Sequence, residues 1–191
     1  MNFNMEENKK KALYKRSLLS LTYSAMLIAI GVILGFLKLP LNPLVEIRFQ
    51  SIPVAISGFL LGPFYGGAVG ALTDILSYIV HPTGEFFPGF TLSSALTGVI
   101  FALFMYKKPF SFVRTILASV INSLVTNFLL NCLWLSILYN TTFSAAFMMR
   151  LPKNLIMIPV DIIIFSIVSK ISYSIYRRSS SSRSDTTEQT H

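Results

Sequence analysis

The chain has 191 residues, of which 53% are hydrophobic and only 13% are charged, and its formal net charge is +8. About a quarter of the residues of an ordinary soluble domain are charged, so this composition excludes that class and indicates a protein of the lipid bilayer. The positive charge could also indicate nucleic-acid binding. The basic residues flank apolar stretches instead of lining one face, however, and this favours a membrane-topology signal.

Six apolar stretches follow one another along the chain. A helix needs about 20 apolar residues to cross the hydrocarbon core of a bilayer. Residues 17–37 meet this requirement without a single charge, and further stretches lie at 46–62, 63–80, 90–106, 112–139 and 153–176. The sequence therefore predicts an all-α integral membrane protein with six transmembrane helices. Five spans, with 46–80 forming one span and a re-entrant hairpin, are the alternative.

The basic residues predict the orientation of these spans. With six spans and an internal N-terminus, twelve Lys and Arg residues fall on the inner side and four on the outer side, where Lys38, Arg48, Arg150 and Lys153 lie. Such a bias is typical of cytoplasmic loops and predicts that both termini are cytoplasmic. We expect a basic cytoplasmic N-terminus at 1–16, a six-helix transmembrane domain at 17–176 and a disordered polar tail at 177–191.

Small residues recur at helical spacing in the first span. Ala25 and Ala29 are four residues apart and are followed by Gly31 and Gly35. Residues at this spacing share a helix face, and small side chains there let another helix approach closely. The spacing alone favours packing within the chain, and docking onto a second membrane protein is the alternative.

A second run of small residues separates the second and third stretches. Gly58, Gly62, Gly66 and Gly70 lie four apart in "GFLLGPFYGGAVG". Pro63 prevents one continuous helix because it lacks an N–H group and clashes with the preceding turn. We expect a tight cytoplasmic turn here, with glycines on both sides that allow close helix packing.

The outer connections carry polar and aromatic residues near helix ends. In "KLPLNPLVEIRFQSIP", Arg48 and Gln50 flank Phe49, and "HPTGEFFPGFTLSSALTG" leads from residue 81 into an apolar helix. The aromatic side chains of Phe86, Phe87 and Phe90 could cover a ligand. The hydroxyl groups at the start of the next helix, Thr91, Ser93 and Ser94, could cap free backbone N–H groups or face a cavity.

Polar residues also lie at membrane depth, where they usually face a cavity or a polar partner. Asp74 lies in the third stretch. In the fifth, Asn127, Asn131 and Trp134 share one face, and in the last, Arg150, Asn154, Met157 or Ile158, and Asp161 share another. Amides and a broad indole suit a flat heteroaromatic ring, whereas hydrogen bonding between helices is the alternative for the Asn residues. Together with the basic residues, they predict an outward-opening pocket for an aromatic anion.

Motifs of common catalytic sites are missing from the sequence. It contains no G-x-x-x-x-G-K-[ST], no H-E-x-x-H and no G-x-S, and it has two His and one Cys. We therefore expect no catalytic residues, no metal site and no cofactor. An intramembrane enzyme that acts on a lipid or a peptide is the alternative from another class.

At residues 17–176 the chain resembles the substrate-binding S components of prokaryotic energy-coupling-factor (ECF) vitamin transporters. The Ala25–Ala29 pair and "IPVAISGFLLGPFYGGAVGALTDIL" are similar to many members. The segments "FFPGFTLSSALTGVIFALF", "NCLWLSILY" and "RLPKNLIMIPV" are most similar to the folate-specific members. An S component for another aromatic vitamin or precursor is the alternative within this family.

The resemblance implies a high-affinity folate-binding subunit, without enzymatic activity, in the prokaryotic cell membrane. Its partners would be a transmembrane coupling protein and two cytoplasmic ATPase subunits, and Ala25, Ala29 and Gly31 would form the docking face. The pterin ring of folate would meet Asn127, Asn131, Trp134 and Asp161. The two carboxylates of its glutamate tail favour contacts with Arg48, Arg150 or Lys153. The other expected substrate-binding residues are Gln50, Phe86, Phe87, Phe90 and Ser94.

Overall fold

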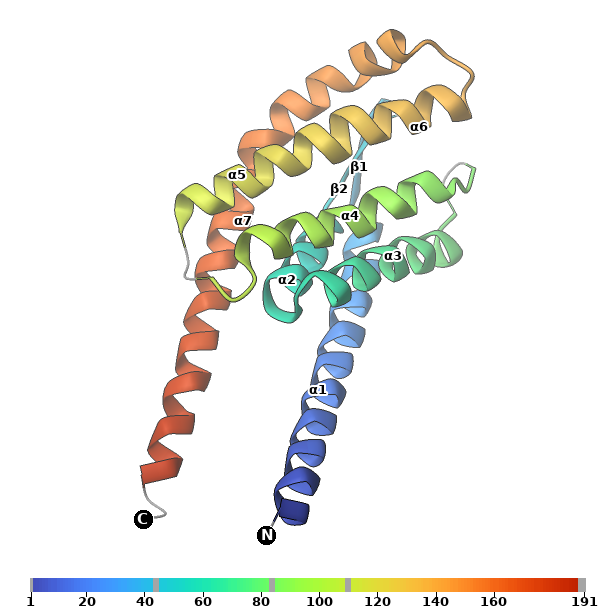
Figure 1. Ribbon diagram of the computed structural model, residues 1–191. Coiled ribbons are helices and arrows are strands. Elements are labelled where there is room, and N and C mark those ends of the chain that lie inside the picture. Colours follow the sequence, from blue (N-terminus) through green and yellow to red (C-terminus); the bar gives the residue numbers. More distant parts are fainter. Residues whose placement is uncertain (1, 43–44, 83–84, 109–110, 189–191) are drawn as a thin grey trace.

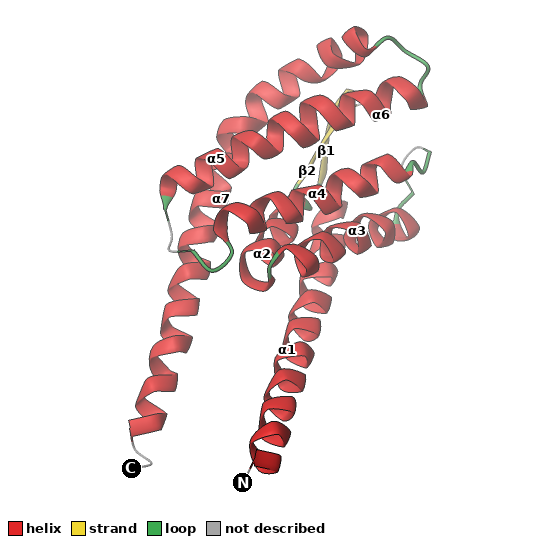
Figure 2. Ribbon diagram, viewed as in Figure 1, coloured by secondary structure: helices red, strands yellow, loops and turns green. Residues whose placement is uncertain are grey.

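The computed structural model describes residues 2–42, 45–82, 85–108 and 111–188, which form a helical molecule (Figures 1 and 2). Its helices are α1 (Asn2–Phe36), α2 (Ser51–Leu61), α3 (Pro63–Val80), α4 (Pro88–Met105), α5 (Phe112–Asn122), the π-helix η1 (Ser123–Leu130), α6 (Asn131–Leu138) and α7 (Phe143–Glu188). Because α5, η1 and α6 follow one another without a break, the six apolar stretches correspond to six helical rods. The helical fold class is confirmed.

A short β-hairpin connects α1 to α2. Strand β1 (Lys38–Asn42) pairs antiparallel with β2 (Val45–Arg48), and Leu39 lies opposite Ile47. These are the only strands in the described part of the chain, and the sequence had assigned residues from 46 onward to a transmembrane span. The alternation of apolar and charged residues in "VEIR" suits the two-residue period of a strand. As a result α2 has only 11 residues, a length of about 16 Å.

The connections between helices gather at two opposite ends of the molecule (Figure 1). Both termini, the turn between α2 and α3 and the connection from α4 to α5 lie toward one end. The hairpin and the connections that follow α3 and α6 lie toward the other. The chain therefore alternates in direction, as a protein that repeatedly crosses a bilayer does.

The terminal helices are longer than the sequence predicted. Helix α1 already begins at Asn2, and α7 continues to Glu188 through most of the segment expected to be a disordered tail. Neither extension contains a Gly or Pro residue, so nothing in the backbone chemistry stops either helix.

Close glycine packing joins α2, α3 and α4. Gly62 adopts a φ of +95° at the turn between α2 and α3, a conformation that L side chains rarely adopt. Gly58 and Gly66 both face the backbone of Gly98 in α4, and a Cβ on Gly98 would meet the carbonyl of Gly66. The predicted turn, with glycines packed on both sides, is confirmed.

We expect Gly98→Ala to destabilise the protein by about 1–3 kcal/mol, the usual range for overpacking. The added methyl group would meet backbone atoms of α3, which cannot rotate away as a side chain can. Thermal unfolding in detergent measures the effect. Gly67→Ala is the matched control, because its Cβ would lie 3.2 Å from the movable side-chain Cγ2 of Val99. Equal unfolding midpoints for both variants would contradict the assigned helix contact.

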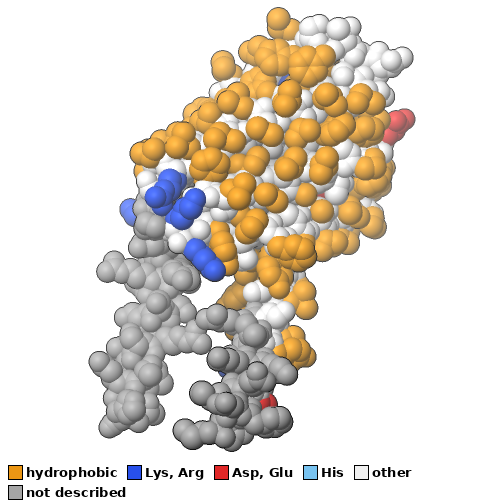
Figure 3. Space-filling view, in the orientation of Figure 1, with side chains coloured by type: hydrophobic (Ala, Val, Ile, Leu, Met, Phe, Trp, Pro, Cys, Tyr) orange, Lys and Arg blue, Asp and Glu red, His pale blue; other side chains and the backbone are white. Residues whose placement is uncertain are grey.

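Large apolar side chains cover the outside of the molecule (Figure 3). Phe64 is 82% exposed, and exposed Leu, Ile, Met and Phe residues lie along α1, α3, α4, α5 and α7. Within the described residues, three helical segments have the length and hydropathy to cross a membrane: Ser17–Phe36, Pro88–Met105 and Phe112–Leu138. Ser51–Leu61 and Asn154–Ile167 are shorter apolar helices. A surface of this kind is stable against lipid rather than water.

Candidate ligand-binding site

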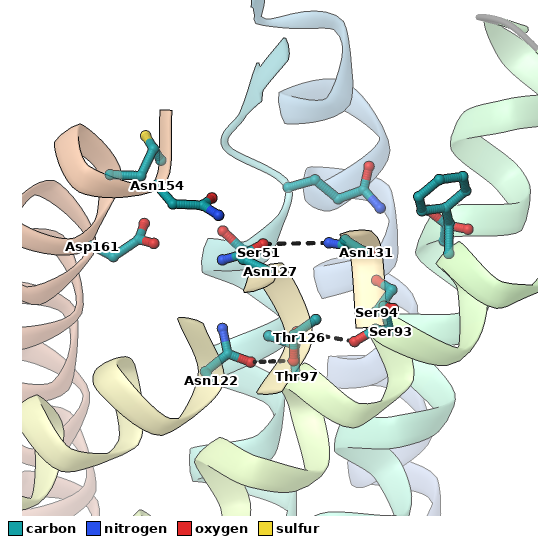
Figure 4. A pocket seen from close by; sticks show the side chains of 14 residues that line it. Ser51, Ser93, Ser94, Thr97, Asn122, Thr126, Asn127, Asn131, Asn154 and Asp161 are labelled. Atoms are coloured by element: carbon teal, nitrogen blue, oxygen red, sulfur yellow. Dashed lines mark hydrogen bonds between the residues drawn. The ribbon is translucent and has the colours of Figure 1, made fainter. Parts of the chain in front are cut away.

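A cavity of about 160 Å³ opens between the helices, and side chains from every helix except α1 reach it (Figure 4). Most of the lining residues have polar side chains, which is unusual inside a membrane protein. The lining residues are Gln50, Ser51, Asp74, Phe90, Ser93, Ser94, Thr97, Asn122, Thr126, Asn127, Asn131, Asn154, Met157 and Asp161.

Carboxylate and amide groups from two rods, α7 and the one formed by α5, η1 and α6, converge on one part of this cavity. In Figure 4, Asp161 and Asn154 of α7 point toward the space that Asn122 of α5 and Asn127 of η1 also face. Asn154 is 2% exposed and Asp161 is 8% exposed. The groups offer both donors and acceptors, so they suit a ligand whose edge carries both.

Two buried polar atoms in the wall have no hydrogen-bond partner among the described residues. The side-chain amide of Asn131 donates to Asn127 Oδ1 at 3.4 Å, while Asn131 Oδ1 accepts nothing. Asn154 Nδ2 likewise has no acceptor. Leaving a buried donor or acceptor unsatisfied costs about 1–3 kcal/mol. An acceptor and a donor held open in one cavity are therefore expected to meet a ligand.

The other carboxylate of the cavity, Asp74, accepts a hydrogen bond from a neighbouring helix. Thr91 Oγ1 of α4 donates to Asp74 Oδ2 of α3 at 2.8 Å. This hydrogen bond joins the two helices that flank the connection at 81–87. The sequence left open whether the Thr91 hydroxyl caps the helix or faces a cavity. In the structure it donates to Asp74, which lines the cavity.

An apolar cluster closes the cavity toward the end that carries the termini. It contains Ala55, Phe101, Met105, Ala118 and Phe165, and the rings of Phe101 and Phe165 lie 4.4 Å apart. On α4, α5 and α7 these residues follow or precede cavity residues by four positions, which is about one helical turn. Among the described residues, this cluster blocks the cavity at the end that carries the termini, so the opposite end, where the hairpin lies, is the expected side of entry.

The only tryptophan stands directly behind the cavity wall. Trp134 Nε1 donates to Ser93 Oγ at 3.1 Å, and the Trp134 ring lies 5.6 Å from that of Phe87. Gly89 makes room for this contact, because a Cβ there would lie 2.5 Å from both Phe87 and Trp134. Trp134 is thus linked to the cavity through a residue that lines it.

The structure brings together about half of the residues that the sequence proposed for substrate binding. Gln50, Phe90, Ser94, Asn127, Asn131 and Asp161 line the cavity. Phe87 and Trp134 adjoin it, whereas Phe86 packs against Tyr78 at 5.1 Å and is 46% exposed. Arg150 is buried but is not among the lining residues. The side chains of Arg48 and Lys153 lie outside the described part of the structure.

Sequence reasoning missed four lining residues completely: Ser51, Thr97, Asn122 and Thr126. Asn122 lies nine residues before Asn131, which is two and a half turns of an α-helix and would place the two on opposite faces. The π-helix between them changes this relation. Thr97 could have been found, because it lies three residues after Ser94 and so shares its helix face.

The two alanines of α1 lie on a free helix face, but Gly31 does not. Ala25 and Ala29 are exposed. Gly31 is buried against α3, where an added Cβ would lie 2.5 Å from Thr73 Cγ2. Gly31 therefore belongs to the internal packing of α1, and its assignment to the docking face was wrong. Around the helix axis it lies about 120° from Ala25 and about 160° from Ala29.

Comparisons with known proteins place this geometry in context. Residues 19–169 match the family model described as the substrate-specific component of ECF transporters. The folate transporter FolT of Clostridium novyi (strain NT) is 38% identical over 143 residues, which cover 74% of this chain and 83% of that protein. The crystal structure of FolT bound with folic acid matches with a TM-score of 0.73 and 32% identity, over 80% of this chain and 96% of that one. The S component for biotin of an ECF-type ABC transporter matches with a TM-score of 0.65 and 25% identity, over 85% and 93%.

Proposed function

The chain belongs to the substrate-specific components of ECF transporters, which are prokaryotic membrane proteins, and on that premise we propose that it captures folate from outside the cell and delivers it to an ATP-driven importer. The observation that carries this proposal is the polar cavity in which Asn131 Oδ1 and Asn154 Nδ2 lack partners. The similarity to folate transporters supports the choice of ligand.

The pterin ring of folate occupies the cavity in this proposal. The 2-amino-4-oxo edge of a pterin places two N–H donors side by side, which a carboxylate such as Asp161 accepts together. Pockets for whole drug-sized ligands measure about 300–1,000 Å³, more than the cavity of about 160 Å³. The cavity therefore holds only part of the ligand, which in this proposal is the ring, and the benzoyl-glutamate part extends outward, where Arg48, Arg150 or Lys153 bind its carboxylates.

Six membrane-crossing rods with both termini in the cytoplasm complete the proposal. The twelve-to-four distribution of basic residues favours this orientation. Lys107 and Lys108 are exposed and directly follow α4, at the end of the molecule toward which the termini also lie (Figure 1). The short α2 reaches from the cavity, which Ser51 lines, to the turn at Gly62. The substrate-binding domain comprises residues 17–176, between a basic N-terminal segment and a polar tail.

The energy for import comes from other subunits. In this proposal two cytoplasmic ATPases hydrolyse ATP and a transmembrane coupling protein transmits its energy, as membership of the ECF family implies. The chain itself contains no G-x-x-x-x-G-K-[ST] motif. The exposed face of Ala25 and Ala29 on α1 is the docking surface for the coupling protein, because small residues allow the close approach on which helix association in lipid depends.

Folate at submicromolar concentration is expected to change the fluorescence of Trp134 in the purified protein. Trp134 is the only tryptophan, and its hydrogen bond to Ser93 connects it to the cavity wall. A titration with folate measures the affinity. N-acetyltryptophanamide titrated in parallel corrects for light that folate itself absorbs.

Riboflavin and biotin are the informative competitors in the same assay. Folate binding should persist when either is present in large excess. If folate leaves the fluorescence unchanged while riboflavin or biotin quenches it, the proposed ligand is wrong and an S component for another vitamin takes its place.

A further inference from the structure

The rod formed by α5, η1 and α6 contains an uninterrupted π-helical segment at Ser123–Leu130. In a π-helix each N–H group bonds to the carbonyl five residues earlier, and the N–H of Asn131 accordingly bonds to the carbonyl of Thr126. Such segments are rare and occur mostly as single turns, often at functional sites. The segment "SLVTNFLL" contains neither Gly nor Pro, so no backbone constraint within it forces the wider turns.

The wider turns change which residues face the cavity. In an α-helix, Asn122 and Asn131 would point in opposite directions, since nine residues make two and a half turns. In the structure both line the cavity, together with Thr126 and Asn127. The π-helix thus assembles one wall of the site from residues that a regular helix would distribute around its circumference.

Asn122 is held in a defined orientation within this wall. It is 4% exposed, and Thr126 Oγ1 donates to its Oδ1 at 3.1 Å. Because the amide oxygen accepts the hydroxyl, the amide nitrogen is the group turned toward Asn154 and Asp161 (Figure 4). This places an N–H donor in the same part of the cavity as the Asp161 carboxylate.

We propose that the π-helical register of Ser123–Leu130 makes Asn122 a ligand-binding residue, whose side-chain N–H donates to an acceptor on the heterocyclic ring, and that Thr126 positions it. This inference rests on the proposed function. It adds Asn122 as the residue that donates a hydrogen bond to a ring acceptor, next to the ring donors that Asp161 binds. A flat ring with donors and acceptors on adjacent positions fits such a pair of groups.

Asn122→Asp is the decisive variant, because it keeps the size of the side chain and the acceptor for Thr126 but replaces the N–H donor with an oxygen. Folate affinity is expected to fall about 10- to 100-fold. Affinity for the isolated pterin fragment should fall by the same factor, and affinity for p-aminobenzoyl-glutamate should not change. Leu124→Ala, an exposed position of the same segment, is the control and should bind as the wild type does.

A double-mutant cycle tests the role of Thr126. Thr126→Val should weaken binding less than Asn122→Ala, and should add nothing when Asn122 is already alanine, since the two act as one unit. If Thr126→Val and Asn122→Ala lower the affinity equally and additively for folate, the pterin fragment and p-aminobenzoyl-glutamate, both residues act only through folding. Unchanged folate affinity in Asn122→Asp, with wild-type binding intact, would overturn the inference and leave the proposed function standing.

The π-helical register can also be tested without any ligand. In a Cys132→Ala background, Asn122→Cys should react with a charged methanethiosulfonate reagent that reaches the cavity through water, and Leu124→Cys should not. Folate should protect Asn122→Cys. Failure of Asn122→Cys to react would overturn the inference even if folate binds. Reaction without folate protection would support the register and contradict the proposed ligand.

Discussion

Asp161→Asn is expected to weaken folate binding by about two orders of magnitude or more. The carboxylate of Asp161 can accept two N–H groups from the pterin edge, whereas an amide offers one acceptor and turns an N–H toward a donor. A hydrogen bond to a charged group contributes about 1.5–3 kcal/mol, and an unpaired buried donor adds a similar penalty. About 2.8 kcal/mol corresponds to a hundredfold change in the dissociation constant. Calorimetric or fluorescence titration of the purified variant measures it.

The other carboxylate of the cavity provides the matched control for this substitution. Asp74 Oδ2 accepts the hydroxyl of Thr91, so Asp74→Asn should reduce folate affinity much less. A pterin analogue without the 2-amino group should bind the wild type weakly and should be affected little by Asp161→Asn. Equal losses for folate and for this analogue would show that Asp161 does not bind the 2-amino edge.

The positions of the helices could be predicted from the sequence because apolar length and helix-breaking residues determine them. The stretch predicted at 63–80 coincides with α3, and that at 112–139 ends one residue beyond α6. The turn at Gly62 follows from Pro63, which begins the next helix. The polar faces of the fifth and last rods were also visible, since Asn127, Asn131 and Asp161 obey simple helical spacing.

The parts of the site that could not be predicted from the sequence depend on backbone geometry, which the hydropathy pattern does not encode. With the regular α-helical period of 3.6 residues, Asn122 and Asn131 would lie on opposite faces of the helix. The π-helix between them brings both to the cavity. The hairpin from Lys38 to Arg48 is too short and too close to an apolar stretch for its two-residue period to stand out. These two departures shape the cavity: the hairpin shortens α2, and the π-helix turns additional polar groups inward.

Helix α1 illustrates how packing decides between two interpretations of one pattern. From spacing alone, the small residues of α1 favoured internal packing. Gly31 fits that interpretation because it contacts Thr73 of α3. Ala25 and Ala29 do not, because both are exposed on the other side of the helix. The proposed docking of a coupling protein would use this exposed pair, which spacing could not distinguish from the buried glycine.

Ala29→Trp is expected to abolish folate uptake by cells while folate binding to the purified protein stays unchanged. The Ala29 side chain points away from the rest of the chain, so an indole there disturbs no internal contact and leaves the cavity intact. Helices in lipid associate through close packing of small residues, and a bulky ring on the docking face would hold the coupling protein away. Accumulation of labelled folate in cells that contain the complete transporter measures the loss, and Ala25→Trp should act in the same way.

Two further substitutions on α1 separate docking from other effects of a bulky residue. Ile30 is 45% exposed and lies about 100° around the helix from Ala29, so Ile30→Trp should leave both uptake and binding intact. Gly31→Trp should lose both, because its side chain would collide with Thr73 and separate α1 from α3. If Ala29→Trp loses binding as well as uptake, that face packs inside the protein. Full uptake by Ala29→Trp would instead mean that the coupling protein docks elsewhere, since a surface that tolerates an indole at its centre is not a close helix contact.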